Sequence, residues 1–178
     1  MSVLPDILGP SLRILFCGTA VGERSAQRGH YYAGPGNDFW RLLHDTGLTP
    51  GLLSPDDDLT LPTFGLGLSD LVQDVAQSHD RGLSFDVPSL VEKLALYEPE
   101  WVAFTSKRAG KAAAHALGHR PPALGPASWS IAECKVFVLP SPSGANRRAS
   151  YDGRATRLSW WQELADLAGQ PTTPASTR

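Results

Sequence analysis

The chain carries near its start an apolar run that ends in two closely spaced glycines, Leu12-Arg-Ile-Leu-Phe-Cys-Gly-Thr-Ala-Val-Gly22. The apolar part predicts a short strand that is buried on both faces, and the glycines predict a tight loop over residues 18–22. In an open parallel sheet, ligands bind where such strands end, because side chains and free backbone N–H groups converge in a crevice there. We therefore expect the functional pocket to be built on residues 18–22.

The length and composition favour a single domain. A chain of 178 residues with 42% hydrophobic residues is long enough to bury one sizeable core, so we expect one domain over residues 1–168. Residues 169–178 are rich in Pro, Thr and Ser, which predicts a disordered tail. No apolar run approaches the roughly 20 residues that cross a bilayer, and the start lacks the features of a secretory signal. We expect a monomeric, cytoplasmic protein of a bacterial-type cytosol without a membrane partner.

Stretches typical of strands and of helices alternate along the chain. Extended stretches are expected over residues 12–17, 61–68, 100–105 and 134–139. Helices are expected between Asn37 and Gly47 and over residues 71–76, 87–97, 107–117 and 151–167, with residues 49–60 as a surface connection. Such alternation is typical of a parallel sheet covered on both faces. The sequence therefore predicts an α/β fold, a three-layer α/β/α arrangement with a central, mostly parallel sheet.

The net charge of −2 lacks the global basic excess that is typical of nucleic-acid binders, so only local clusters can contact phosphates. The basic clusters are Arg24 with Arg28, Lys107 with Arg108 and Lys111, and Arg147 with Arg148, Arg154 and Arg157. Each cluster is either a solvated surface or a set of phosphate contacts. Cys17 and Cys134 are expected as buried core residues, and no spacing of cysteines and histidines predicts a metal site.

Three motifs resemble those of the uracil-DNA glycosylase superfamily, in particular its branch of mismatch-specific uracil-DNA and thymine-DNA glycosylases. Gly18-Thr-Ala-Val-Gly22 is similar to the family's Gly-Ile-Asn-Pro-Gly, and Ser141-Pro-Ser-Gly144 is similar to its Asn-Pro-Ser-Gly. Between them, Ala33-Gly-Pro-Gly-Asn-Asp-Phe-Trp40 resembles the stretch in which Pro, Asn, Phe and Trp open a helix. Three such motifs in the same order are more specific than any one of them alone. The resemblance runs from about Arg13 to Leu167.

The resemblance implies a DNA repair hydrolase that excises uracil from G:U mismatches, and other damaged bases, in double-stranded and also single-stranded DNA. Such an enzyme flips the nucleotide into a pocket that holds the base by an aromatic face and hydrogen bonds. By the match Tyr32 stacks on the base; its alternative role is a half-buried tyrosine that fills a gap. N–H groups near Thr19 and Ala20 can stabilise the base as it leaves as an anion. Gly18 and Ser141 complete the expected base-binding set.

Ala20 occupies the position of the family's catalytic asparagine. Alanine can neither orient a water nor take its proton, so either catalysis is impaired or another group has taken over. Other branches of the superfamily resemble this chain in combining alanine there with a carboxylate from elsewhere. We expect Asp70 to supply it as a general base, a role that contributes on the order of a hundredfold or more in rate. Alternatively, Asp70 caps the helix over residues 71–76, with Gln73 completing a capping box.

The loop over residues 140–147 is expected to press into the minor groove beside the flipped base, where apolar wedges usually hold the gap open. Ala145 stands where related enzymes carry a larger residue, so Asn146 or Arg147 is expected to help fill the gap. The expected DNA-contacting residues of this loop are Ser143, Gly144, Ala145, Asn146 and Arg147. Arg147 and Arg148 are expected to grip phosphates. Ser25 matches a serine of the family's first loop and is expected to contact a phosphate; otherwise it caps the following turn.

The leading hypothesis is a monofunctional glycosylase that needs neither a metal nor a cofactor and associates with the nucleoid when acting. No lysine is placed by the match to form a Schiff base, so strand cleavage is not expected. A non-catalytic module that recognises damaged or mismatched DNA is the first alternative, and a small-molecule hydrolase is the second. Glu23, Asp38 and Asp74 are further carboxylate candidates, each also explained as a surface or helix-start charge.

Overall fold

The computed structural model describes residues 2–79 and 81–169 and places five strands in one sheet. The strands are β1 (Ile14–Val21), β2 (Leu66–Ala76), β3 (Trp101–Phe104), β4 (Gly125–Ile131) and β5 (Cys134–Val138). They lie in the order β2-β1-β3-β5-β4, and all neighbouring pairs are parallel except β4 with β5. The predicted, mostly parallel sheet is therefore confirmed. The predicted disordered tail lies outside the described residues, apart from Gly169.

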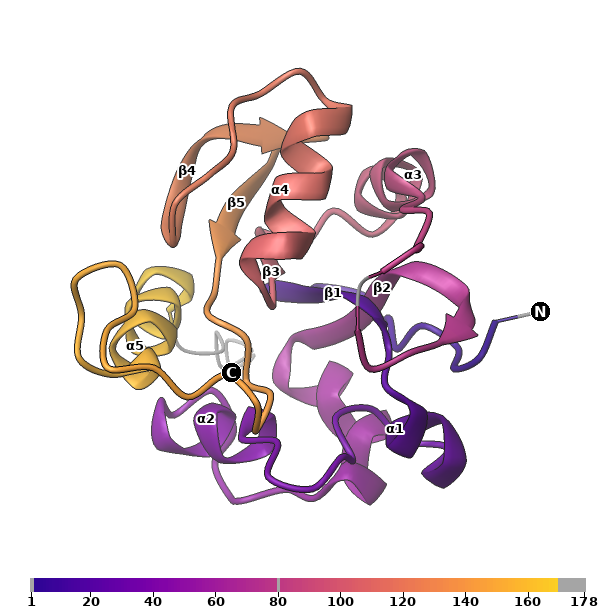
Figure 1. Cartoon of the computed structure of the whole chain (residues 1–178), viewed down its shortest axis with the longest axis vertical. Coiled ribbons are helices and arrows are strands. Elements are labelled where there is room, and N and C mark those ends of the chain that lie inside the picture. Colours follow the sequence, from indigo (N-terminus) through magenta and orange to yellow (C-terminus); the bar gives the residue numbers. More distant parts are fainter. Residues whose placement is uncertain (1, 80, 170–178) are drawn as a thin grey trace, which may run out of the picture.

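Helices cover both faces of this sheet. They are α1 (Glu23–Arg28), α2 (Phe39–Asp45), α3 (Val87–Tyr97), α4 (Lys107–Ala116) and α5 (Arg157–Ala168), together with the 3-10 helix η1 (Pro55–Phe64). Helix α3 packs against α4 on one face, and α2 packs against α5 on the other (Figure 1). The predicted three-layer α/β/α arrangement is thus confirmed. None of the described helices has the length and hydrophobicity needed to cross a membrane.

Strand β1 is the centre of the core, as its apolar run predicts. Residues 14–17 are fully buried. The ring of Phe16 meets Phe39 of α2 edge-on, with 5.4 Å between ring centroids, and stacks on Trp161 of α5 at 5.7 Å. Aromatic pairs of this kind contribute about 0.5–1.5 kcal/mol beyond the burial of their area. These contacts hold β1 against helices α2 and α5.

Strand β1 also includes most of the expected loop over residues 18–22, which corrects that prediction. It continues to Val21 because it pairs with β2, and Gly18 lies directly opposite Asp70. On its other side, the pairing with β3 ends at Cys17 and Phe104. The last four residues of β1 therefore extend beyond the end of β3, and they border the space that lies past the end of β3.

The helix predicted over residues 71–76 is wrong, because these residues belong to β2. Leu71 and Val72 are buried, and apolar residues so close together fit either a helical face or a buried strand. Pairing with β1 favours the strand. Asp70 therefore lies within a strand and caps no helix, and the side chain of Gln73 donates a hydrogen bond to the Asp70 carbonyl oxygen at 2.9 Å. The alternative role of Asp70 is thus removed.

Two other segments differ from their predictions. The η1 helix takes up the second half of the expected surface connection, so the extended stretch begins at Leu66 and not at residue 61. Strand β4 has no counterpart among the predicted strands. Exposed and half-buried residues alternate between its two buried ends, as expected for an antiparallel strand at the edge of a sheet.

Helix α5 is shorter than predicted, because it begins at Arg157 and not at Tyr151. Thr156 sets this start by capping the first turn with its side chain. Leu158 and Leu167, which were expected on the buried face, are 38% and 46% exposed. The later start of the helix places Arg157, at its first position, inside the protein.

The first residues of the chain lie along the outer edge of β2. Ile7 and Leu68 exchange both backbone hydrogen bonds, of 2.9 and 2.8 Å, in antiparallel pairing. Further along, the Val3 N–H donates to the Gln73 carbonyl oxygen at 2.6 Å. The strand that carries Asp70 therefore has backbone partners on both sides.

Candidate active site

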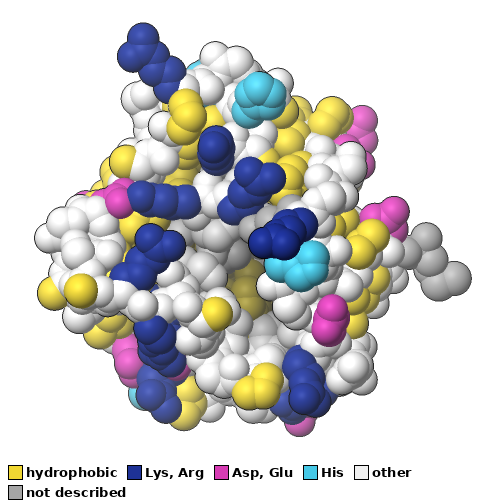
Figure 2. Space-filling view, viewed as in Figure 1, with side chains coloured by type: hydrophobic (Ala, Val, Ile, Leu, Met, Phe, Trp, Pro, Cys, Tyr) yellow, Lys and Arg dark blue, Asp and Glu magenta, His cyan; other side chains and the backbone are white. Residues whose placement is uncertain are grey.

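A cleft of about 750 Å³ opens at the carboxyl ends of β1 and β3. The chain passes from β1 to β2 on one side and returns through α3 to β3 on the other, so these strand ends form a switch point of the sheet. Residues 18–22 line the cleft, as predicted, together with parts of loops 31–37 and 140–146. Figure 2 shows a hollow on this face with Lys and Arg side chains around it.

Asp70 faces the cleft through a space that exists because residue 18 is glycine. A Cβ atom built on Gly18 would lie 2.6 Å from Asp70 Oδ1, too close for any real contact. It would also lie 3.3 Å from Thr105 Oγ1 and 3.6 Å from the Tyr32 hydroxyl. One carboxyl group and two hydroxyl groups from three separate segments therefore converge in front of Gly18. The structure therefore places the Asp70 carboxyl group beside the first motif, and its catalytic role stays a prediction.

The carboxyl group of Asp70 is poorly solvated. The residue is 7% exposed, and its buried Oδ2 accepts no hydrogen bond from any described residue. Burial raises the pKa of Asp70 well above its ordinary value, the negative charge of Asp6 raises it further, and Lys93 opposes the shift. Asp6 is itself paired with Lys93 at 2.7 Å. The Asp70 side chain is thus more basic than an exposed carboxylate, which suits it to accept a proton.

Tyr32 is held in the cleft by two contacts. Its ring stacks on Phe39, with 4.0 Å between centroids and 17° between planes, and its hydroxyl shares a 3.1 Å hydrogen bond with Thr105. Its φ of 51° is left-handed, a conformation that non-glycine residues seldom adopt and that marks functional sites. Burial chiefly raises the pKa of Tyr32, with Asp70 adding to the shift, so its hydroxyl stays neutral. Since Phe39 covers one face of the ring, only the opposite face or an edge can meet a base.

Thr105 is a residue of the cleft that the sequence interpretation missed. It is 4% exposed and follows β3 directly, and its N–H donates to the Cys17 carbonyl oxygen at 3.0 Å. The available signal is its position as the polar residue that ends the apolar strand over residues 100–105. Its role escaped notice because a threonine there has no counterpart in the three motifs.

The expected anion-stabilising groups border the same space. Thr19 and Ala20 lie past the last residue pair between β1 and β3, and both line the cleft. Ser141 lies across from them in loop 140–147, where its hydroxyl oxygen accepts a 3.2 Å hydrogen bond from the Ser143 N–H. Its hydroxyl hydrogen therefore remains available to donate. All three predicted roles remain predictions, with positions that are compatible with them.

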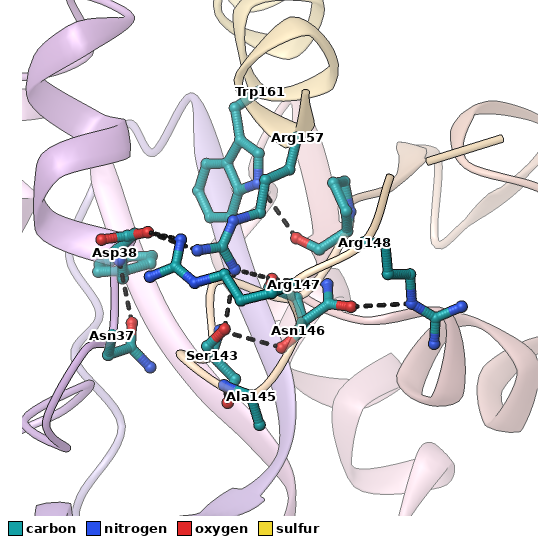
Figure 3. Close-up of polar contacts among 12 residues, drawn as sticks. Asn37, Asp38, Ser143, Ala145, Asn146, Arg147, Arg148, Arg157 and Trp161 are labelled. Carbon is teal, nitrogen blue, oxygen red and sulfur yellow. Dashed lines mark hydrogen bonds and ion pairs between the residues drawn. The ribbon is translucent and has the colours of Figure 1, made fainter. Parts of the chain in front are cut away.

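Loop 140–147 is tightly bonded within itself. The Asn146 side-chain amide donates to the Ser141 carbonyl oxygen at 3.0 Å, and the Ala145 N–H donates to Ser143 Oγ at 3.2 Å. Ala145 is exposed at the tip of the loop, whereas the Arg147 side chain turns back onto Asp38, with 3.0 Å between the paired atoms (Figure 3). Asp38, a further carboxylate candidate, is therefore engaged in ion pairing. Asn146 is likewise engaged within the loop.

Gly144 lies where loop 140–147 approaches loop 31–37 closely through their backbones. A Cβ atom on this residue would lie 2.9 Å from the carbonyl oxygen of Gly36, and backbone cannot move aside as a side chain can. We expect Gly144→Ala to lower the free energy of unfolding by about 1–3 kcal/mol, measured by urea denaturation. Gly51→Ala is the control, because nothing lies within 4 Å of a Cβ there. Equal stability of the two variants would contradict the close packing of the loops.

The remaining predicted contacts are placed as follows. Ser25 lies within α1 and caps no turn; its hydroxyl oxygen accepts a 2.9 Å hydrogen bond from the Ala33 N–H and lines the cleft. Glu23 and Asp74 are exposed and lie outside the cleft lining. A phosphate contact of Ser25 therefore stays a prediction.

The basic clusters differ in their surroundings. The cationic side chains that line the cleft are Arg24, Lys107, Arg108 and Arg148. Arg154 lies over the ring of Trp160, 3.5 Å from its centroid, and pairs with Glu163. Arg157 is only 6% exposed, which corrects both expectations for this residue, a solvated charge or a phosphate contact.

Cys17 and Cys134 are buried free thiols, as predicted. Burial is the main cause that raises the pKa of both, so neither is poised as a thiolate. Among residues 2–79 and 81–169, no three His, Cys, Asp or Glu side chains come together in a way that could hold a metal ion.

A family model described as the uracil DNA glycosylase superfamily matches residues 5–165. A solution NMR structure from Methanosarcina acetivorans, provisionally described as a uracil DNA glycosylase, is similar with a TM-score of 0.60 and 24% sequence identity. The match covers 93% of this chain and 96% of that one, so the two share one fold along nearly their whole length.

Proposed function

Because the chain belongs to the uracil DNA glycosylase superfamily, we propose that it hydrolyses the N-glycosidic bond of uracil in DNA, with G:U mismatches as its main substrate. The carrying observation is the Asp70 carboxyl group, which lies beside Gly18 in the first motif and faces the cleft. A general base at this point can orient the water and take its proton, which Ala20 cannot do.

The proposed reaction needs the uracil nucleotide to leave the duplex and enter the cleft. The cleft volume of about 750 Å³ accommodates a nucleotide, and Tyr32 and Ser141 line it. Asp70 holds a water and accepts its proton as the water oxygen bonds to the sugar carbon. The bond to the base breaks at the same time, and the base leaves with the electron pair. N–H groups near Thr19 and Ala20 stabilise that anion, because fixed donors cost no reorganisation during the reaction.

In this proposal the DNA contacts loop 140–147 and the cationic side chains that line the cleft, Arg24, Lys107, Arg108 and Arg148. Phosphate contacts position a duplex without reading its sequence, and the Lys and Arg side chains around the hollow in Figure 2 provide local positive charge in a protein whose net charge is −2. Binding should weaken as salt rises, because each phosphate contact releases counterions. The protein also acts on single-stranded DNA in this proposal, since an unpaired uracil needs no flipping.

The test is an excision assay on DNA that carries uracil opposite guanine, opposite adenine, or in a single strand. We expect abasic sites, revealed by alkali, with the fastest release from the G:U duplex. No strand cleavage is expected without alkali, and thymine-containing DNA of the same sequence is the control. Salt-sensitive DNA binding with no base released from any substrate would instead favour a non-catalytic DNA-binding module, for which Ala20 is the supporting observation.

A further inference from the structure

A buried arginine ties loop 140–147 to the helical layer beneath it. Arg157, the first residue of α5, donates hydrogen bonds to the carbonyl oxygens of Ser141 at 2.7 Å and Ser143 at 2.9 Å. Its guanidinium group also forms an ion pair with Asp38, directly before α2. Figure 3 shows Arg157 between Asp38 and the loop. Three segments that are far apart in the sequence thus meet on one side chain.

Asp38 holds the loop by two further contacts. Its N–H donates to the Pro142 carbonyl oxygen at 2.9 Å, which joins the start of α2 to the middle of the loop. The same carboxylate oxygen that pairs with Arg157 also pairs with Arg147 at 3.0 Å. The Arg147 side chain is 62% exposed, whereas the Arg157 side chain is 7% exposed. One carboxylate oxygen therefore bridges a buried and an exposed guanidinium group.

The burial of Arg157 implies a specific role, because a buried charge is costly unless its donors are paired. Loop 140–147 has no regular secondary structure, so its inward-facing carbonyl groups need donors from elsewhere. The planar guanidinium group can serve two carbonyl groups and a carboxylate at once, which the single ammonium group of lysine cannot do with the same geometry. Arg157 therefore fixes the shape of the loop and its distance from α2.

We propose that Arg157, together with Asp38, is a positioning residue that holds loop 140–147 in the shape needed to enter duplex DNA. This inference rests on the proposed function. Because Asp38 keeps Arg157 as a partner, Arg147 can leave it for a DNA phosphate without exposing an unpaired buried charge. The loop can then engage the duplex while its base stays fixed.

The inference separates duplex from single-stranded substrates. Entry of the loop tip is needed only where a base must be held out of a duplex, whereas Ser141, at the start of the loop, lines the cleft for both substrates. Arg157→Lys keeps the charge but loses the forked geometry. We expect it to reduce excision from a G:U duplex roughly tenfold to a hundredfold, the scale that a misplacement of about 1 Å produces. Excision from single-stranded DNA should fall by a smaller factor, because it needs Ser141 but no entry of the loop into a duplex.

The second measurement needs no chemistry. A duplex with the fluorescent base 2-aminopurine beside the uracil reports unstacking as the nucleotide flips. We expect Arg157→Lys to lose most of the fluorescence increase of the unaltered protein. Arg120→Lys is the matched control, because Arg120 is exposed and lines no part of the cleft. Thermal melting shows whether Arg157→Lys is folded. If it is not, Asp38→Asn is the second variant, because it removes the carboxylate and keeps the size of the side chain.

The outcomes are distinguishable. A markedly larger loss on duplex DNA than on single-stranded DNA, together with loss of the flipping signal, supports the inference. Equal losses on both substrates, or unchanged flipping and excision, overturn the positioning role and leave the proposed glycosylase intact. If the unaltered protein excises uracil from neither substrate, the proposed function fails, and the fluorescence comparison alone then decides for or against the role of Arg157.

Discussion

Asp70→Asn is expected to reduce uracil excision on the order of a hundredfold or more, on duplex and single-stranded DNA alike. The amide is nearly isosteric with the carboxyl group but cannot take the proton of the attacking water. Single-turnover rates on both substrates provide the measurement. Asp74→Asn is the matched control, because Asp74 is exposed on the same strand and lies outside the cleft lining. Excision by Asp70→Asn at the wild-type rate would remove Asp70 from the mechanism.

The same variant should behave differently from the wild type as pH changes. The raised pKa of Asp70 means that the folded protein keeps this proton at pH values where the unfolded chain has lost it. Wild-type stability therefore falls as pH rises from the ordinary pKa of aspartate to the raised pKa of Asp70, and Asp70→Asn escapes this loss. We expect the variant to be the more stable protein at neutral pH, with the difference vanishing in acid. Wild-type excision should rise with pH over the same window, as the carboxylate forms, whereas the residual activity of the variant should not.

Gly18→Ala is expected to cause a loss of similar size, without a change in any ionisable group. Its methyl group would lie 2.6 Å from Asp70 Oδ1, so the carboxyl group must turn away. The displaced atom is at the end of a side chain, so the fold should tolerate the change. A shift of about 1 Å in a catalytic group can cost on the order of a hundredfold in rate. Excision kinetics and thermal melting together separate this result from unfolding.

The double variant sharpens this test. If Gly18→Ala acts only through Asp70, then Gly18→Ala combined with Asp70→Asn should be no slower than Asp70→Asn alone, because residues that act as one unit are not additive. Gly51→Ala serves again as the control for an added methyl group. Multiplying losses in the double variant would show that Gly18 contributes by a route other than the position of Asp70.

Local patterns were sufficient for strands β1, β3 and β5 and for helices α2, α3 and α4. The apolar run over residues 12–17 predicts β1, and the spacing over residues 87–97 predicts α3, because burial dominates both. The stretch over residues 71–76 failed, since its apolar residues fit a helix and a strand equally and only pairing with β1 distinguishes them. Strand β4 was missed for a similar reason. Its antiparallel pairing with β5 makes it a strand, and its own residue pattern does not reveal that pairing.

The candidate site was predictable where it rests on sequence motifs and on the direction of the strands. Asp70 was placed beside residues 18–22 although the helix expected after it was wrong, because the direction of the strand alone brings it there. Thr105 was missed because it has no counterpart in the three motifs, although it ends an apolar strand. The contacts of Arg157 were missed because they reach residues at least 14 positions away, such as Ser143. Contacts between distant segments leave no local trace in composition or spacing.

The pairing of the first residues with β2 has a consequence for how the cleft can move. Without Val3 and Ile7, the outer edge of β2 would be an unsatisfied row of amides and carbonyls, open to fraying and to pairing with a second molecule. Because this edge is covered, the backbone around Asp70 should exchange its amide protons as slowly as the centre of the sheet does. The Asp70 carboxyl group is thus held in place before DNA arrives, and adjustment to the substrate is confined to exposed side chains such as Arg147.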